Sequence, residues 1–197
     1  MIAMEHLGLF LVAGVVLNLT PGPDVLYIVS QALRGGVRPG LVAALGITAG
    51  CFVHVAAAAL GVGALLTASA MAFNALKWVG AAYLVWVGCR LLWRQASSDS
   101  NAVLSASVSP GVSALKTVFF NGFMTNVLNP KVALFFLAFL PQFIAPGTSD
   151  PTTAFLALGL LFNLASVPIN LGWAALAAWL AGRPSMMRRR RGRRTGH

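Results

Sequence analysis

The chain has 197 residues, of which 58% are apolar and only 9% are charged. A soluble domain carries about 25% charged residues, so this composition excludes an ordinary water-soluble protein. The formal net charge of +10 does not indicate a nucleic-acid partner, because half of the basic residues lie in residues 183–197, after an apolar segment. We therefore expect an all-α membrane protein whose basic tail lies at an anionic membrane surface.

Five stretches are apolar over a length that crosses a bilayer, since a helical span needs about 20 residues. The first and fourth stretches contain proline-rich interruptions, and the others are continuous. In chain order the predicted spans are Leu7–Leu33, Pro39–Leu66, Ala70–Trp93, Thr117–Leu140 and Thr152–Leu180.

The first span is interrupted by the sequence NLTPGPD at Asn18–Asp24. Two prolines and a glycine within three positions prevent an ordinary helix from running through it. We expect the helix to stop near mid-membrane and restart, with Thr20 as a cap and Asp24 in the new first turn. Asp24 is the only acid in any predicted span, which indicates a functional group, with simple helix capping as the alternative. The candidate substrate- or ion-binding residues here are Asn18, Thr20, Pro21, Gly22, Pro23 and Asp24.

The second and third spans contain few polar groups. Gly46 and Gly50 are four residues apart, which is typical of close contact between membrane helices. His54 lies alone in an alanine-rich segment and is either a hydrogen-bonded structural histidine or a proton- or substrate-binding group. Cys51 and Cys89 show neither a metal-binding nor a disulfide spacing, and we expect no metal and no cofactor.

Basic residues alternate between the predicted connections. The first connection contains Arg34 and Arg38, the third is flanked by Arg94 and Lys116, and the tail contains seven arginines. The second and fourth connections contain no lysine or arginine. By the positive-inside rule, the N-terminus lies outside and the tail lies in the cytoplasm.

The fourth span is interrupted at Asn129-Pro130. Asn126 and Asn129 are polar groups that need partners in lipid. Lys131 is the only basic residue deep within a predicted span. About nine apolar residues separate it from the end of the span, which favours an inward-facing role over snorkelling to the surface. Asn126, Asn129, Pro130 and Lys131 are therefore further candidates for substrate or ion binding.

The fifth span contains Pro168 and two asparagines. Asn163 and Asn170 either line the same polar cavity or join neighbouring helices, so Asn163 is an additional site candidate together with His54. Four tryptophans are interpreted as anchors at the membrane interface: Trp78, Trp86, Trp93 and Trp173.

The two broken spans occupy corresponding places in two halves of the chain, and the second half starts on the opposite side of the membrane. This pattern is typical of an inverted repeat whose interrupted helices meet at a midplane site. We expect a first three-helix repeat at residues 1–94, a cytoplasmic linker at 95–116, a second repeat with two helices at 117–182, and an arginine-rich cytoplasmic tail at 183–197.

These motifs resemble those of the LysE/RhtB amino-acid exporters. The resemblance rests on Asn18–Asp24, on Gly35-Gly36 before a glycine-rich span, and on Asn129-Pro130-Lys131 leading into Phe139–Phe143. It implies a bacterial inner-membrane exporter of amino acids such as threonine, homoserine or leucine, or of related small metabolites. Family members typically have six helices, so the resemblance also implies that a sixth span is missing here.

The expected function is secondary transport without enzymatic activity. Asp24 would hold the substrate ammonium or a coupling proton, and Lys131 or the restarted helix would face the substrate carboxylate. In the empty state we expect Asp24 and Lys131 to pair. The expected partners are an amino acid, protons, the lipid bilayer and further copies of the chain in a homo-oligomer, but no nucleic acid.

Two alternatives to an active exporter stay open. One is a truncated, inactive or partner-dependent remnant, which the missing sixth span suggests. The other is a membrane thiol redox carrier. The second idea is disfavoured because Cys51 and Cys89 lie in the second and third predicted spans, outside both broken ones.

Overall fold

The computed structural model describes residues 4–68, 115–145 and 148–182, together with the single positions 71, 78 and 82. Every regular element in this part of the chain is a helix, which confirms the all-α class. Most of the predicted third span, most of the predicted linker and the whole arginine-rich tail lie outside the described residues, so the count of five spans stays a prediction.

The first predicted span forms two helices, α1 (Met4–Leu19) and α2 (Pro23–Gly35), that meet at an angle of 48°. Pro23 occupies the first turn of α2, where its missing N–H costs nothing and its fixed φ suits the helix. The N-cap is Gly22, with φ −149° and ψ −173°, and no side chain caps this end. The interruption is confirmed, but the expectation that Thr20 caps the new helix is wrong.

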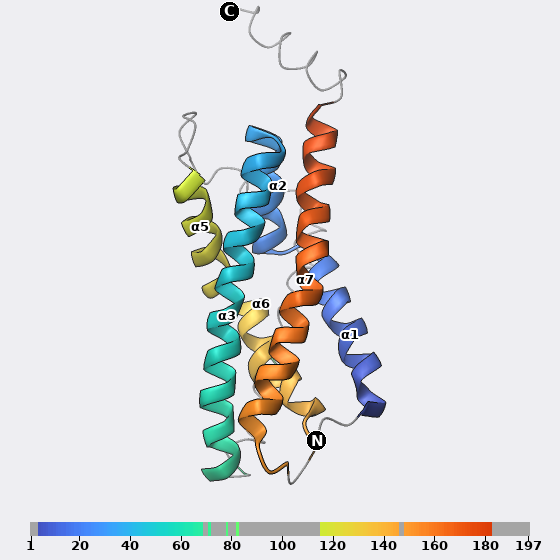
Figure 1. Cartoon of the computed structure of the whole chain (residues 1–197), viewed down its shortest axis with the longest axis vertical. Coiled ribbons are helices and arrows are strands. Elements are labelled where there is room, and N and C mark those ends of the chain that lie inside the picture. Colours follow the sequence, from blue (N-terminus) through green and yellow to red (C-terminus); the bar gives the residue numbers. More distant parts are fainter. Residues whose placement is uncertain are drawn as a thin grey trace, which may run out of the picture.

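A single residue separates α2 from α3 (Val37–Ala68). Gly36 has φ +81°, a conformation that strains residues with a Cβ, and its N–H donates to the Ala32 carbonyl at 2.9 Å. This tight turn places Arg34 and Arg38 at one end of the molecule, where α5 also begins (Figure 1). We call this the basic end.

The fourth predicted span is also broken. It consists of α5 (Leu115–Val127), α6 (Pro130–Leu134), a π-helical turn η1 (Phe135–Phe139) and a 3₁₀ turn η2 (Leu140–Phe143), and α5 is bent by 44° from the rest. Asn129 caps α6, because its side-chain oxygen accepts the Lys131 backbone N–H at 3.0 Å. The predicted break at Asn129-Pro130 is confirmed.

The last described helix, α7 (Pro151–Ala181), is continuous through Pro168. Asp150 is its N-cap and accepts the Thr153 backbone N–H at 3.0 Å, as well as the Thr153 hydroxyl. These hydrogen bonds stabilise the charged carboxylate, and the one from the Thr153 hydroxyl has the largest effect. They hold the pKa of Asp150 below its ordinary value of 3.8. The cap therefore stabilises the fold above pH 3.8, and this contribution is lost as the pH falls through the lowered pKa.

We expect Asp150→Ala to lower the melting temperature in detergent slightly at neutral pH, while Asp150→Asn leaves it nearly unchanged because Asn also caps helices. The difference between wild type and Asp150→Ala should shrink as the pH falls below 3.8. Equal melting temperatures of wild type and Asp150→Ala at neutral pH would show that this cap contributes nothing.

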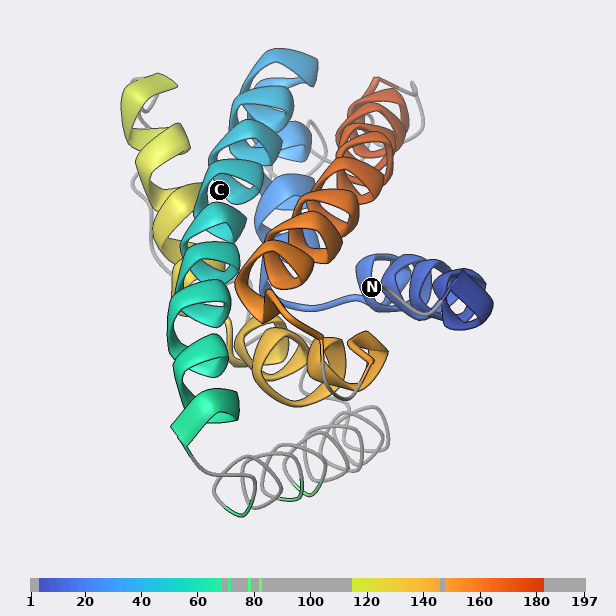
Figure 2. The ribbon, with the colours of Figure 1, turned by 60° about the horizontal axis from the view of Figure 1, so that its bottom comes forward.

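The long helices α3 and α7 lie side by side, with α5 on the other flank of α3 (Figures 1 and 2). The helix α1 extends away from the bundle on the side of α7 (Figure 2). Contact between α3 and α5 is close: a Cβ added at Gly46 would meet the Phe119 carbonyl oxygen at 2.2 Å, and one at Gly50 would meet the Phe123 carbonyl oxygen at 2.6 Å. The predicted small-residue contact face is confirmed.

The two ends of the bundle are packed differently. Toward the basic end, mostly small side chains form the core: Ile28, Ala43, Ala44, Ile47, Val118 and Ala174. Toward the opposite end the core is rich in aromatic rings, with the Phe135 and Phe162 centroids 4.5 Å apart. Its buried members are Phe10, Cys51, Val55, Ala58, Ala59, Val132, Phe135, Phe136, Leu140, Phe143, Phe155, Leu158 and Phe162.

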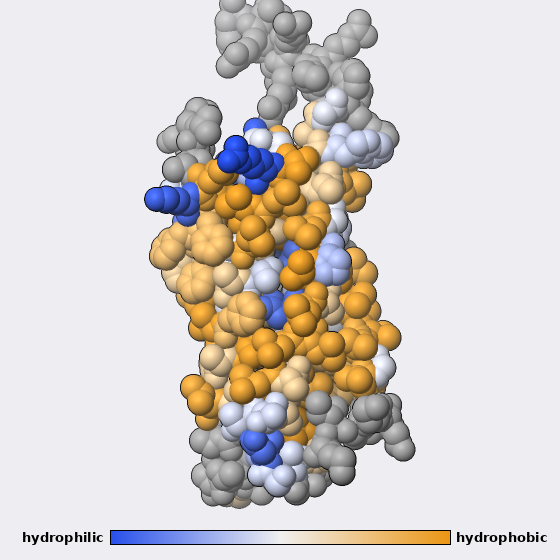
Figure 3. All heavy atoms as spheres, in the orientation of Figure 1, coloured by the Kyte–Doolittle hydropathy of each residue, from blue (hydrophilic) through white to orange (hydrophobic). Residues whose placement is uncertain are grey.

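By length and composition, the described helices give two continuous membrane-spanning candidates, at Val37–Gly61 and Pro151–Ala181, or four if each bent pair is one span. Large apolar side chains stay exposed along them, including Leu60 at 72% and Leu164 at 69%. The visible face is mostly apolar, with hydrophilic residues at the two ends and in a small area at mid-height (Figure 3). Lipid is the solvent that tolerates such a surface.

Candidate functional site

The breaks in the two bent helix pairs meet inside the bundle. Asp24, in the first turn of α2, is 9% exposed and accepts a hydrogen bond from the Asn126 side-chain amide of α5 at 2.9 Å. The two residues are 102 positions apart in the sequence. The structure thus brings together one candidate from each interruption, and it places the carboxylate at the positive end of α2.

Lys131 connects the second break to the end of α1. Its ammonium donates to the carbonyls of Leu17 at 2.8 Å and Thr20 at 2.9 Å. These carbonyls belong to the C-terminal turn of α1 and the residue after it, where a cation is favoured. Lys131 therefore faces inward, as the sequence indicates, rather than toward the membrane surface.

Asp24 and Lys131 do not form the direct ion pair that we expect from the sequence. Lys131 is close enough to interact electrostatically with the carboxylate, but its described hydrogen bonds go to backbone carbonyls. The reason is the break itself: the last carbonyls of α1 have no helical partner and attract the ammonium.

Gly22 is needed for a different reason than backbone freedom. Its φ of −149° is extended backbone that other residues also adopt. A Cβ at this position would lie 3.3 Å from the Lys131 ammonium nitrogen and 3.6 Å from its Cε. The glycine thus leaves room for the lysine side chain to pass to the end of α1.

Three buried polar atoms around Asp24 have no hydrogen-bond partner: Asp24 Oδ1, Asn126 Oδ1 and Asn129 Nδ2. Asn129 is only 1% exposed and lies near enough to interact with the Asp24 carboxylate, but it does not complete a hydrogen bond to it. Unpaired groups at this depth are costly, so their presence together makes this cluster the candidate site. Together these three atoms offer two hydrogen-bond acceptors and one hydrogen-bond donor.

His54 of α3 contacts the same cluster. Its Nε2 lies 2.9 Å from the Asn126 carbonyl oxygen, and its ring stacks on Phe136 with centroids 6.0 Å apart. Because a carbonyl only accepts, Nε2 must carry the proton. This contact positions the end of α5 and fits the structural interpretation of His54.

The remaining candidates act within helices or between them. Asn18 donates to the Gly14 carbonyl at 2.8 Å, and the Thr20 hydroxyl donates to the Val16 carbonyl at 2.6 Å, so both bond within the first interrupted span. Asn163 joins α7 to α3 by donating to the Thr48 carbonyl at 3.2 Å. The prolines Pro21, Pro23 and Pro130 are exposed and shape the breaks.

The family model of the LysE type translocators matches residues 15–195. The chain belongs to this family. The matched range includes both breaks, the cluster around Asp24 and the motifs that resemble LysE/RhtB exporters in the sequence. No solved structure matches the chain.

Three relatives illustrate what this LysE type translocator is similar to. An uncharacterized membrane protein of Vibrio cholerae serotype O1 is 36% identical over 171 residues, covering 87% of this chain and 80% of the relative. A homoserine/homoserine lactone efflux protein of Salmonella typhimurium is 31% identical over 182 residues, covering 90% and 84%. A leucine efflux protein of Enterobacter sp. (strain 638) is 31% identical over 157 residues, covering 80% and 72%.

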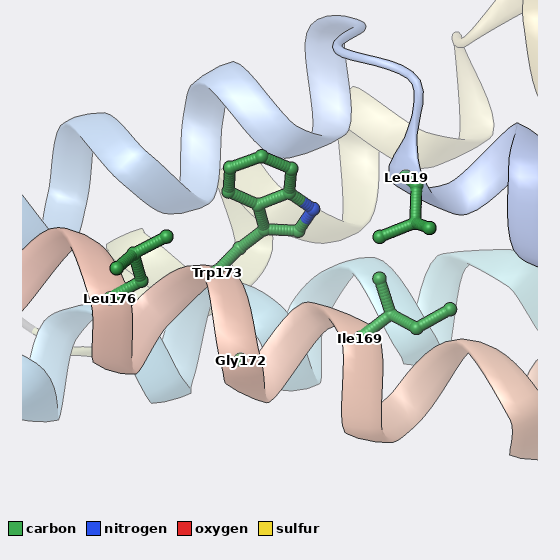
Figure 4. Close-up of a pocket in the computed structure, with 5 residues that line it drawn as sticks. All are labelled: Leu19, Ile169, Gly172, Trp173 and Leu176. Atoms are coloured by element: carbon green, nitrogen blue, oxygen red, sulfur yellow. The ribbon is translucent and has the colours of Figure 1, made fainter.

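The translocator also has a pocket that the sequence did not indicate. It has a volume of about 280 Å³ and lies between the end of α1 and one face of α7 (Figure 4). The positions on α7 follow helical spacing, but only the fold shows that the end of α1 lies opposite them. Its lining residues are Leu19, Ile169, Gly172, Trp173 and Leu176. Trp173, expected to be an interface anchor, packs here against the small-residue core.

Proposed function

We propose that this chain is a secondary transporter that exports an amino acid or a closely related small metabolite across the bacterial inner membrane. The observation that carries this proposal is the cluster of unpartnered buried polar atoms between the two broken helices: Asp24 Oδ1, Asn126 Oδ1 and Asn129 Nδ2. Membership of the LysE type translocator family and the efflux names of two relatives support the same conclusion.

The cluster has the chemistry that recognises an α-amino acid. An ammonium group donates up to three hydrogen bonds and fits the two unpaired acceptor oxygens of Asp24 and Asn126. A carboxylate only accepts, and it fits the unpaired Asn129 amide together with the positive N-terminal end of α2. Each group of the substrate would satisfy protein atoms that otherwise stay unpaired in lipid.

Transport requires these atoms to become accessible. All three are covered in the described conformation, so a substrate reaches them only after the helices around the breaks move. The electrostatic partner of Asp24, Lys131, holds the end of α1 through Leu17 and Thr20. We infer that substrate binding to Asp24 loosens this contact and allows alternating access of the inverted-repeat type.

Proton coupling follows from the same carboxylate. A proton and a substrate ammonium compete for Asp24, so protonation from outside would release the substrate there, and deprotonation inside would restore the site. By the positive-inside rule we expect the basic end, which carries Arg34 and Arg38, to face the cytoplasm.

The test is metabolite profiling of the medium of cells that express wild type, Asp24→Asn or no transporter. Wild type should raise the concentration of at least one amino acid in the medium. Asp24→Asn, which has nearly the same shape, should reduce this export by about 10- to 100-fold, since a hydrogen bond to a charged group contributes about 1.5–3 kcal/mol. Equal membrane levels of both proteins are the control. Unchanged export by Asp24→Asn would remove Asp24 from the mechanism.

A further inference from the structure

The pocket beside α7 is formed by one stripe of that helix. Ile169, Gly172, Trp173 and Leu176 follow the spacing i, i+3, i+4, i+7, which places them on one face. Leu19, the last residue of α1, forms the opposite wall (Figure 4). All five lining residues are apolar except for the indole N–H of Trp173.

Gly172 is unlike the glycines that serve helix packing. A Cβ at Gly46, Gly50, Gly122 or Gly159 would meet a neighbouring atom at 2.2–2.9 Å, so each of these positions lets another helix approach closely. A Cβ at Gly172 would meet nothing within 4 Å. Glycine inside a helix is less favourable than alanine. Packing gives no reason for this residue, and its effect is to keep the pocket open.

Trp173 provides the one polar atom of the pocket. Its Nε1 is buried and has no hydrogen-bond partner. Figure 4 shows the nitrogen on the edge of the indole that faces Leu19. Leu19, on the opposite wall, is 51% exposed. A lipid chain or an apolar helix face in the pocket would leave the donor unpaired, whereas a ligand with an acceptor oxygen would satisfy it.

The pocket and the Lys131 contact share the end of α1. Leu19 lies between Leu17 and Thr20, whose carbonyls bind the Lys131 ammonium. The same turn of chain therefore faces the charged site through its backbone and the pocket through the Leu19 side chain. The end of α1 thus links the pocket to Lys131, which interacts electrostatically with Asp24.

We propose that this pocket is the specificity pocket of the transporter, and that it receives an uncharged aliphatic side chain of the exported amino acid. An oxygen on that side chain would accept the Trp173 Nε1 hydrogen. The inference rests on the proposed export function and adds the residues that choose among substrates: Gly172 sets the length of side chain that fits, and Trp173 distinguishes oxygen-bearing side chains from purely apolar ones.

The first experiment measures uptake by counterflow in proteoliposomes with alanine, homoserine and leucine as probes. Gly172→Leu fills the pocket, and we expect it to reduce leucine transport relative to alanine by about 10-fold or more, the usual discrimination against a group that no longer fits. Gly61→Leu is the matched control, because a Cβ there also meets nothing within 4 Å and Gly61 lies outside the pocket. An unchanged ratio of leucine to alanine transport in Gly172→Leu would overturn the size assignment.

The second experiment compares homoserine with norvaline, which replaces the hydroxyl by a methyl group at nearly the same size. Wild type should transport homoserine better than norvaline. Trp173→Phe should lower this ratio about fivefold, which corresponds to the loss of one neutral hydrogen bond. If both variants keep the wild-type ranking of substrates while Asp24→Asn still reduces transport, the pocket binds lipid or another helix and this inference alone fails. If wild type transports none of the probes, both this inference and the proposed function fail.

Discussion

Lys131→Met should abolish transport and lower the stability of the protein by about 3 kcal/mol. The lysine ammonium makes two hydrogen bonds to carbonyls, to Leu17 at 2.8 Å and to Thr20 at 2.9 Å, and charged hydrogen bonds contribute about 1.5–3 kcal/mol each. Methionine keeps most of the volume but leaves both carbonyls unpaired. It also removes the electrostatic partner of the Asp24 carboxylate. The measurements are counterflow transport and the melting temperature in detergent.

Two control variants test whether the effect is specific to the Lys131 contact. Lys116→Met removes a lysine of α5 that is exposed near the basic end, so transport and melting temperature should stay near wild type. Lys131→Arg keeps the charge and should recover part of the stability, but its larger planar head fits poorly where the lysine side chain passes over Gly22. Normal transport and stability in Lys131→Met would contradict the role of this contact.

Gly46→Leu should prevent assembly of the folded protein. Even the Cβ of the new side chain would lie 2.2 Å from the Phe119 carbonyl oxygen and 3.0 Å from its carbonyl carbon, and these are backbone atoms that cannot rotate away. Gly46→Ala should already cost about 3 kcal/mol, the upper part of the usual range for an overpacked contact. The amount of monodisperse protein after detergent extraction measures this effect.

Gly61→Leu provides the comparison on the same helix. It makes the same change in α3, at a position where a Cβ meets nothing within 4 Å, so extraction and melting temperature should match wild type. If Gly46→Leu and Gly61→Leu behaved alike, the close contact of α3 with α5 would not limit folding.

Much of the fold follows from local chemistry that a sequence displays. Prolines at positions 21, 23 and 130 stop helices wherever the rest of the chain lies, and both breaks occur where they predict them. Long apolar runs give the two continuous spans with bounds within two residues of α3 and α7. The importance of Asp24 also follows from its isolation, because a carboxylate among apolar residues needs partners.

The sequence does not indicate which atoms each polar side chain binds. Lys131 binds carbonyls of α1, and any residue has such carbonyls, so no pattern of side chains indicates this contact. The sequence predicts that Thr20 caps α2, but its hydroxyl donates to the Val16 carbonyl instead, the other local hydrogen bond open to a threonine. The Trp173 pocket exists only because α1 ends opposite α7.

The glycine contact between α3 and α5 has a consequence for how such a protein can move. Helices that touch through side chains can slide by changing rotamers, but here backbone meets backbone at Gly46, Gly50 and Gly122, with no rotamers to absorb a displacement. We therefore expect α3 and α5 to move together in any conformational change. Since α3 belongs to the first half of the sequence and α5 to the second, we expect this contact to hold the two halves of the chain together.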